Sequence, residues 1–445
     1  MSQLGFGLLL GEMLMGGLAL ILDTQLSASA HSAMSERLFE TRRLSIELAA
    51  PLSAEDMVVQ AMEDASPTKW HLAHTTWFFE TFVLTPYLNG YQLFDEAFNY
   101  CFNSYYEHLG ARQPRPKRGL LTRPSLDRVL AYRQHVDLAL AQLLAEQTEA
   151  SPALIHTLEV GTNHEQQHQE LMLTDLLALF AANPLKPAYR PPQPRSIPAP
   201  CEPLRWIDFA GGVYSIGHGG KGFAWDNEGP RHDVLLRPFR LADRLVTNRE
   251  WLAFVADGGY ETATLWLSDG WAAIMRDWHA PLYWESRDGE WFEMSLEGLQ
   301  PLNLDAPVAH VSYYEADAFA RWSGKRLPTE FEWEVAGATA PKQGNFLGTA
   351  ALRPRPVDVE PNGSPRQMFG DVWEWTQSAY LPYPGYRAPE GALGEYNGKF
   401  MVGQHVLRGG SCVTPQDHIR PSYRNFFYPH QRWQFLGLRL ASEVA

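Results

Sequence analysis

The sequence has few cysteines, and this excludes two classes of structure. Its 445 residues include only three, Cys101, Cys201 and Cys412, which lie far apart and form no C-x-x-C pair. An odd and dispersed set argues against a disulfide-stapled scaffold and against a zinc site built from cysteine. We therefore expect the protein to work in a reducing compartment, namely the cytoplasm.

Positive charge is scarce as well. The sequence has 37 Lys and Arg residues but 51 Asp and Glu residues, which gives a formal net charge of −14. Nucleic-acid binding requires a basic face against the phosphates, so we expect no nucleic-acid partner. Aromatic residues are instead plentiful, with 15 Trp, 18 Tyr and 22 Phe. Such a supply suits small flat or cationic ligands that are held against ring faces.

One apolar run, GFGLLLGEMLMGGLALIL, stands out near the start of the sequence. No Lys or Arg precedes it, Glu12 interrupts it, and it is short for a membrane span. Met34 then opens MSERLFETRRL, which is typical of an ordinary cytosolic start. We interpret residues 1–33 as a non-native or disordered extension, with an export signal as the alternative, and we expect no membrane partner.

Residues 34–183 are predicted to form long helices, because apolar residues recur there at three- and four-residue spacing. Ser53 and Ser66 are predicted to be the N-caps of the second and third helices. Helices joined by mostly short links favour a four-helix bundle, in which inward-facing side chains can build a metal site. The expected helices cover residues 38–50, 53–62, 66–84, 125–146 and 153–182.

The composition changes after these helices. Residues 183–200 hold seven prolines in eighteen positions, which indicates an extended, semi-rigid linker that we place at residues 184–203. Residues 204–445 are rich in Gly and Trp and are typical of short strands with glycine turns. The sequence predicts strands within residues 206–217, 232–242 and 405–413 and helices over 247–258 and 312–324. The chain is thus predicted to be an α+β multidomain protein.

The stretch NHEQQHQELM contains His164, Glu165 and His168 in the order H-E-x-x-H, the helical pattern of zinc peptidases. A peptidase of this kind needs a third ligand, yet Leu171 and Thr174 occupy the positions where the extended motif has Gly and His. No Glu follows Glu170 until residue 202, beyond the proline-rich segment. A peptidase is therefore disfavoured.

The segment WHLAH offers another source for a third ligand. His71 and His74 lie three residues apart, and His164 and His168 four apart, so each pair shares one face of a helix. Three neutral imidazoles would leave two or three positions open on an iron ion, which suits oxygen chemistry. The alternative is that these histidines belong to the core and are hydrogen-bonded to backbone.

Several of these segments together resemble one known family. SPTKWHLAHTTWFFE, FNSYYEHLGARQPRPKRGLL and NHEQQHQELM, followed by RGGSC, YRNFFYP and LGLRL, closely resemble the ergothioneine-biosynthesis sulfoxide synthases, or hercynine oxygenases, in their cysteine-using bacterial subgroup. The resemblance spans about residues 36–445. It implies a DinB-like four-helix bundle at 34–183 and a C-type-lectin-like domain, similar to the formylglycine-generating enzymes, at 204–445.

The resemblance also implies an activity. Members of this family are non-haem iron(II) enzymes that use O₂ to join a thiol sulfur to C2 of the imidazole of hercynine, leaving the sulfur as a sulfoxide. The thiol donor is cysteine or γ-glutamylcysteine. Carried over residue by residue, His74, His164 and His168 would hold Fe²⁺, while His71 would be structural.

The resemblance assigns further residues to the two substrates. Tyr105 and Tyr106 match a tyrosine pair near the iron, one of which would serve as proton donor; the alternative is that they only pack. Gln167 matches a glutamine that contacts substrate, and Glu170 would support the site from beside the ligand face. The residues implied for the thiol substrate are Arg115 and Arg118, for its carboxylate, and Asp64, for its ammonium group.

In the second domain Asn425, Phe426 and Phe427 match positions that line the hercynine site. A trimethylammonium group cannot donate a conventional N–H hydrogen bond, so aromatic faces are natural partners for it. Adjacent strand residues cannot face the same way, so the alternative is that both Phe side chains belong to the core. The resemblance leads us to expect an active site at the junction of the two domains.

Three other functions compete with this interpretation. Formylglycine-generating enzymes need a cysteine pair near the C-terminus, but here Cys412 has no companion after it, so that activity is disfavoured. A homologue forming a C–Se bond from a selenosugar would share the iron site, although Arg115 and Arg118 favour an amino-acid thiol. A metal-free binding protein is the alternative from another class.

Overall fold

The computed structural model describes residues 30–147, 151–193, 201–274, 277–357, 363–390, 392–395 and 397–444. Most of the predicted N-terminal extension, and residues 194–200 of the predicted linker, lie outside the described residues. The chain divides into two compact units, one that ends at Leu176 and one that begins at Leu177. Within the described part of the chain, no helix has the length and apolarity that a membrane crossing requires.

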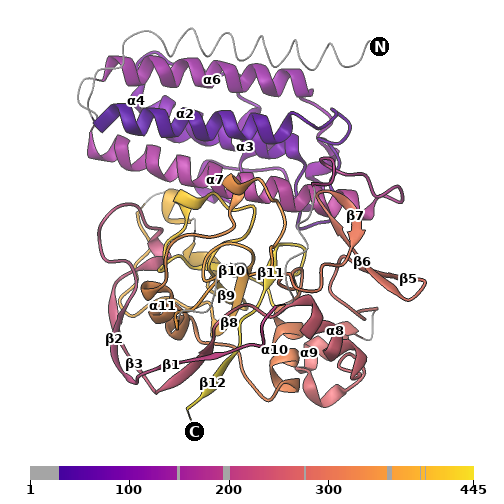
Figure 1. The fold of residues 1–445 in the computed structure, drawn as a ribbon. Helices are drawn as coiled ribbons and strands as arrows, with labels where there is room; N and C mark the ends of the chain where they lie inside the picture. Colours follow the sequence, from indigo (N-terminus) through magenta and orange to yellow (C-terminus); the bar gives the residue numbers. More distant parts are fainter. Residues whose placement is uncertain are drawn as a thin grey trace. The chain divides into compact units, whose positions relative to one another are not determined.

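The first unit is a bundle of long helices that lie side by side (Figure 1). This confirms the expected helical N-terminal region. Among the described residues, its long helices are α2 Ala30–Ala49, α3 Thr68–Phe79, α6 Leu126–Glu146 and α7 Pro152–Ala182, whose last turns belong to the second unit. The shorter elements are the π-helical turn Glu80–Leu84, α4 Thr85–Tyr87, α5 Phe98–Phe102 and the 3₁₀ turns Glu107–Leu109 and Arg115–Leu120.

Helix α3 is central in this bundle, because all twelve of its residues are buried. A helix that is covered on every side has no polar stripe to expose to water. Its polar side chains must therefore find partners inside the protein. This explains how Thr, Lys and His residues can share α3 with Trp and Phe residues, and it places two histidines deep in the bundle.

Two details of the predicted helices are wrong. Residues 54–58 form a turn, because Ser53 and Asp56 exchange hydrogen bonds of 3.0 and 3.2 Å but the chain does not propagate a helix from there. A single turn is an unfavourable nucleus, and Val58 and Val59 are weak helix formers. Ser66 does not cap α3, whose N-cap is Pro67 and has no side-chain hydrogen bond.

The second unit combines short strands with short helices, as expected for an α+β domain. Its helices are α8 Asn248–Ala256, α9 Ser268–Ile274, α10 Tyr313–Trp322 and α11 Glu330–Thr339. Its strands are β1 Trp206–Phe209, β2 Gly212–Ile216, β3 His232–Leu236, β4 Phe239–Ala242, β5 Trp284–Arg287, β6 Glu290–Ser295, β7 Gly298–Pro301, β8 Trp373–Ala379, β9 His405–Arg408, β10 Asn425–Phe427, β11 Leu436–Gly437 and β12 Ala441–Glu443.

These strands form four small sheets, with orders β1-β4-β12, β10-β9-β8-β11, β2-β3 and β5-β6-β7. The predicted helices α8 and α10 are confirmed, and Thr247 and Ser312 cap them in capping boxes with Glu250 and Glu315. Helix α11 was not predicted, although a capping box also begins it. Its Trp333 packs with Phe346 and Phe369 in the core of this unit.

Candidate metal centre

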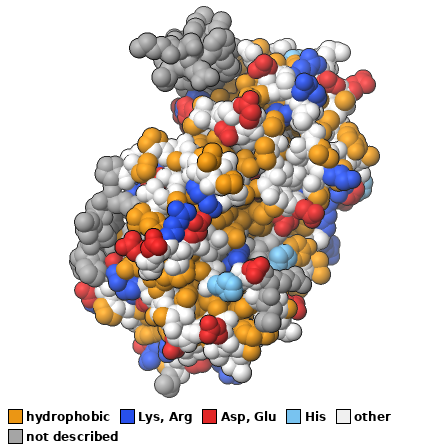
Figure 2. Space-filling model, turned by 90° about the vertical axis from the view of Figure 1, so that its right-hand side faces the viewer, with side chains coloured by type: hydrophobic (Ala, Val, Ile, Leu, Met, Phe, Trp, Pro, Cys, Tyr) orange, Lys and Arg blue, Asp and Glu red, His pale blue; other side chains and the backbone are white. Residues whose placement is uncertain are grey.

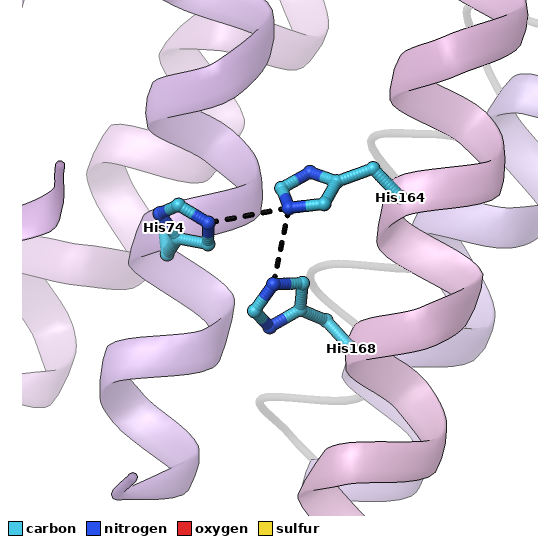
Figure 3. Close-up of side chains that lie close together, drawn as sticks. All are labelled: His74, His164 and His168. Carbon is cyan, nitrogen blue, oxygen red and sulfur yellow. Dashed lines mark hydrogen bonds between the residues drawn. The ribbon is translucent and has the colours of Figure 1, made fainter. Parts of the chain in front are cut away.

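Three histidines of the first unit converge in the bundle interior. His74 comes from α3, and His164 and His168 lie one turn apart on α7, so that all three rings point to one spot (Figure 3). The Nε2 atom of His164 lies 3.3 Å from Nε2 of His74 and 3.1 Å from Nε2 of His168. The three ligand atoms lie within 4.8 Å of one another, and all three side chains are buried.

Burial keeps these three rings neutral. It lowers the pKa of His164 to about 3 and holds the pKa of His74 and His168 well below the ordinary value, and the neighbouring histidines lower both further. A neutral imidazole is the form that binds metal. The Nδ1 atom of His74 lies 2.5 Å from the carbonyl oxygen of Phe102 and donates its proton there. The lone pair of Nε2 is therefore the one that this ring can offer to a metal. The residues present therefore fit a transition-metal ion.

Glu165 does not face the three histidines. It accepts hydrogen bonds from Arg42, at 2.9 Å, from Ser45, at 2.6 Å, and from Arg133. Burial alone would raise the pKa of Glu165, but the two guanidinium groups outweigh it and hold the pKa below its ordinary value. A carboxylate fixed in this way is a structural anion of the bundle. The geometry thus agrees with the exclusion of a peptidase, whose glutamate must act as a base.

His71 lies against one of the converging histidines. Its Nδ1 atom is 2.7 Å from Nδ1 of His168, and its Nε2 atom is 3.1 Å from Oδ2 of Asp175. The family resemblance implied a structural role for His71, whereas Asp175 was not predicted. A signal was present, because Asp175 follows His168 by seven residues and so lies on the same face of α7.

Arg118 is stacked beside the histidines. Its guanidinium carbon lies 3.4 Å from the ring centroid of Trp70, and the Trp70 ring stacks in turn on His74 at 4.5 Å. Its Nη atoms donate 3.0 Å hydrogen bonds to the hydroxyl oxygens of Ser66 and Ser104. Burial, and then the charge of Arg115, lower the pKa of Arg118 well below its ordinary value.

This buried cation lacks a counter-ion within the described residues, where no carboxylate lies at ion-pair distance from Arg118 and its Nε–H has no hydrogen-bond partner. A buried charge without a partner is costly, so this arrangement favours an anionic ligand. Arg115, three residues earlier, is exposed. The structure thus places the two predicted arginines in different environments.

Two residues that were not predicted from the sequence hold the turn that carries these arginines. The amide of Gln60 donates to the Arg115 carbonyl at 2.9 Å and accepts from the Gly119 backbone N–H at 2.8 Å, so it spans the turn. Lys69 of α3 donates to the carbonyls of Leu121 and Pro124, at 2.9 and 2.8 Å. Neither residue carries a sequence pattern, because each acts on backbone atoms of a distant segment.

The other predicted residues of this unit differ in their burial. Tyr106 is fully buried and packs on Trp77 and Phe82, with ring centroids 5.8 and 5.0 Å apart, whereas Tyr105 is half-buried. The amide of Asn103 holds the Tyr106 backbone through bonds of 2.9 and 3.1 Å. Two further predicted residues, Asp64 and Gln167, are half-buried, and Glu170 is buried.

In the second unit, Asn425, Phe426 and Phe427 form β10, which pairs antiparallel with β9 at the edge of its sheet. Phe426 stacks on Tyr380 with ring centroids 4.1 Å apart, whereas Phe427 meets Trp433 edge to face at 5.6 Å. The two rings therefore point to opposite faces of the sheet, as strand pleating requires. All three residues are half-buried.

Two family models match the chain. Residues 37–172 match the DinB superfamily, and residues 205–358 and 360–444 match the sulfatase-modifying factor enzyme 1-like domain. These matches confirm the predicted fold class of a DinB-like bundle followed by a domain similar to the formylglycine-generating enzymes.

Curated relatives match most of the chain. The chain is 37% identical to the hercynine oxygenase of Mycolicibacterium thermoresistibile, over 63% of this chain and 68% of the relative. It is 34% identical to the hercynine oxygenase of Mycobacterium tuberculosis, over 71% of this chain and 78% of the relative. It is 37% identical to that of Mycolicibacterium smegmatis, over 63% of this chain and 70% of the relative.

Proposed function

Because the chain belongs to the hercynine oxygenase family of enzymes, we propose that it is an iron(II)- and O₂-dependent sulfoxide synthase of ergothioneine biosynthesis. In the proposed reaction, one thiol, one hercynine and one O₂ give one sulfoxide-linked conjugate and one water. The S–H bond and the imidazole C2–H bond break, a C–S and an S–O bond form, and O₂ takes up the four electrons. The observation that carries the proposal is the convergence of three buried, neutral histidines.

We assign Fe²⁺ to the Nε2 atoms of His74, His164 and His168. Bound iron(II) would supply the redox chemistry by which O₂ oxidises the thiol sulfur. Three protein ligands leave open positions, which is typical of non-haem iron oxygenases. The protein's part is to hold both substrates in a fixed relation, which converts a meeting of separate molecules into an ordered internal reaction.

The thiol substrate is proposed to place its carboxylate on Arg118. This guanidinium is already desolvated and stacked on Trp70, so an anionic partner gains a charge-assisted hydrogen bond at little further cost of burial. Arg115 and Asp64 are assigned to the same substrate, at its carboxylate and its ammonium group. Two arginines in this position support cysteine or γ-glutamylcysteine over the selenosugar of a C–Se-forming homologue.

Replacing Arg118 with leucine is expected to raise the KM for the thiol about 10- to 150-fold, the equivalent of ~1.5–3 kcal/mol for a charge-assisted hydrogen bond. The KM for hercynine should change little. Steady-state kinetics with each substrate varied in turn checks this. Arg123→Leu, on the same loop but exposed, is the control and should behave like the unaltered enzyme. Equal losses for both substrates in Arg118→Leu would show that this residue only supports the loop.

Hercynine is assigned to Gln167 and to the strand segment β10, which comprises Asn425, Phe426 and Phe427. A trimethylammonium group is attracted to the faces of aromatic rings, and half-buried rings on a strand can present such faces. Asn425 and Phe427 alternate with Phe426 along the strand, so they share one face of β10. We therefore propose that Asn425 and Phe427 contact hercynine and that Phe426 supports the strand through its stack on Tyr380.

We further propose that the partners are small molecules and that the enzyme works in the cytoplasm. Acidic and basic side chains are interspersed on the face drawn in Figure 2, and the net charge is −14; both support small-molecule over nucleic-acid partners. The three free cysteines support a reducing compartment.

Metal analysis of the purified protein separates an enzyme from a metal-free binding protein. The proposal predicts one iron per chain after anaerobic loading with Fe²⁺, and loss of turnover when a chelator removes it. A protein that holds no metal yet binds hercynine tightly would support the binding-protein alternative instead.

A further inference from the structure

We infer that His71 and Asp175 form a positioning pair for His168, which fixes the ring of this proposed metal ligand and strengthens it as a donor. The inference rests on the proposed function, because it takes His168 as a ligand. His71 comes from α3 and Asp175 from α7, and both side chains are buried. The three residues form one chain of contacts from Asp175 through His71 to His168.

The direction of each hydrogen bond follows from the chemistry of imidazole. A neutral ring that offers Nε2 to a metal carries its proton on Nδ1, so His168 must donate from Nδ1 to Nδ1 of His71, 2.7 Å away. His71 then carries its own proton on Nε2. That proton is donated to Oδ2 of Asp175, 3.1 Å away. One carboxylate thereby selects the tautomers of two rings.

The carboxylate is itself held in place. Oδ2 of Asp175 also accepts a 2.7 Å hydrogen bond from the backbone N–H of Ser66, just before α3. Because Asp175 is bonded to backbone and buried, it cannot readily turn away from His71. His71 in turn is packed against Trp70 at a centroid distance of 5.7 Å, which restricts its rotation.

The pair distinguishes His168 from His74. Nδ1 of His74 lies against the neutral carbonyl of Phe102, whereas the hydrogen bonds that start at Nδ1 of His168 end on the carboxylate of Asp175. The negative charge of Asp175 attracts the shared protons along the hydrogen bonds from His168 through His71. The Nε2 atom of His168 thereby becomes a stronger electron-pair donor to a metal. Losing such a partner typically weakens metal binding 10- to 100-fold.

The test measures metal affinity rather than turnover. The full chain is stripped of metal and titrated anaerobically with Fe²⁺ and, separately, with Co²⁺, whose absorption bands report the geometry of the ligands. His71→Leu, which removes the acceptor for His168, should bind both ions 10- to 100-fold more weakly and shift the cobalt bands. His71→Asn, whose amide oxygen can replace Nδ1 as acceptor, should recover most of the affinity.

Asp175→Asn separates charge from hydrogen bonding. The asparagine oxygen can still accept from His71 and Ser66, so the fold should be kept while the negative charge is lost. We expect metal binding about tenfold weaker, with shifted cobalt bands. His156→Gln, at an exposed position on the same helix α7, is the matched control and should bind metal normally.

The outcomes are distinct. Unaltered affinity and cobalt bands in both His71→Leu and Asp175→Asn would overturn the inference while leaving the metal site intact. If His71→Leu does not fold, as judged by circular dichroism, unchanged binding by Asp175→Asn alone overturns it. Failure of the unaltered protein to bind Fe²⁺ or Co²⁺ would instead refute the proposed function, and the inference with it.

Discussion

Replacing His74, His164 or His168 with alanine is expected to abolish sulfoxide formation and the retention of iron. Each substitution removes one of three donors, and the remaining two histidines cannot complete the site. Losing only a hydrogen-bond partner of a ligand costs up to about 100-fold in metal affinity, so losing the ligand itself should cost more. Iron content after desalting and turnover with both substrates are the measurements.

The bundle should still fold in these variants, since the long helices bury many apolar side chains besides the three rings. Circular dichroism and thermal unfolding of the metal-free proteins check this. His156→Ala on α7 is the control and should keep full activity, because His156 is exposed. If one of the three variants folds and still retains stoichiometric iron and turnover, the histidine replaced in it is not a metal ligand.

Replacing a tyrosine of the pair with phenylalanine is expected to change the product rather than substrate binding. A positioned proton donor contributes about 10²- to 10⁴-fold to the rate. Loss of the tyrosine hydroxyl that acts as the proton donor should therefore lower the rate of sulfoxide formation by that factor. Oxygen consumption should then shift toward simple oxidation of the thiol. In Tyr106→Phe the ring should keep its packing on Trp77 and Phe82, so the fold is preserved.

The ratio of sulfoxide to oxidised thiol, measured by mass spectrometry for Tyr105→Phe and Tyr106→Phe, identifies the donor. Tyr100→Phe is a control from the preceding helix, where the side chain is 47% exposed, and should leave the ratio unchanged. If both variants at positions 105 and 106 keep the full product ratio, neither hydroxyl donates the proton. The iron assignment would stand in that case.

Helical spacing explains why the convergence of histidines could be anticipated. His164 and His168 had to share one face of α7, and a WHLAH segment on a second helix could supply a third ring. What spacing cannot show is which atoms face each other across two helices. The contact between His71 and His168, and the carboxylate of Asp175 behind it, depend on how α3 and α7 pack, which no periodicity along one helix determines.

The same limit explains the misassigned helix after Ser53 and the unrecognised role of Gln60. Ser53 has the side chain of a helix cap and makes the expected exchange with Asp56, yet no helix follows, because local capping does not provide burial. Helix α11 differs, because its capping box at Thr329 and Glu332 is a local signal that the sequence itself carries. The role of Gln60 at the arginine turn could not be identified, because the two backbone atoms that it contacts there lie more than fifty residues away in the sequence.

The most direct test of the central claim is to identify the product. The metal-free protein is loaded anaerobically with Fe²⁺ and given hercynine with either cysteine or γ-glutamylcysteine. O₂ is then added, and the products are analysed by mass spectrometry. We predict a conjugate that carries one thiol and one oxygen atom on the hercynine imidazole, with ¹⁸O₂ supplying that oxygen. Iron-loaded protein that binds both substrates and consumes O₂ but forms no C–S bond with either thiol would contradict the account.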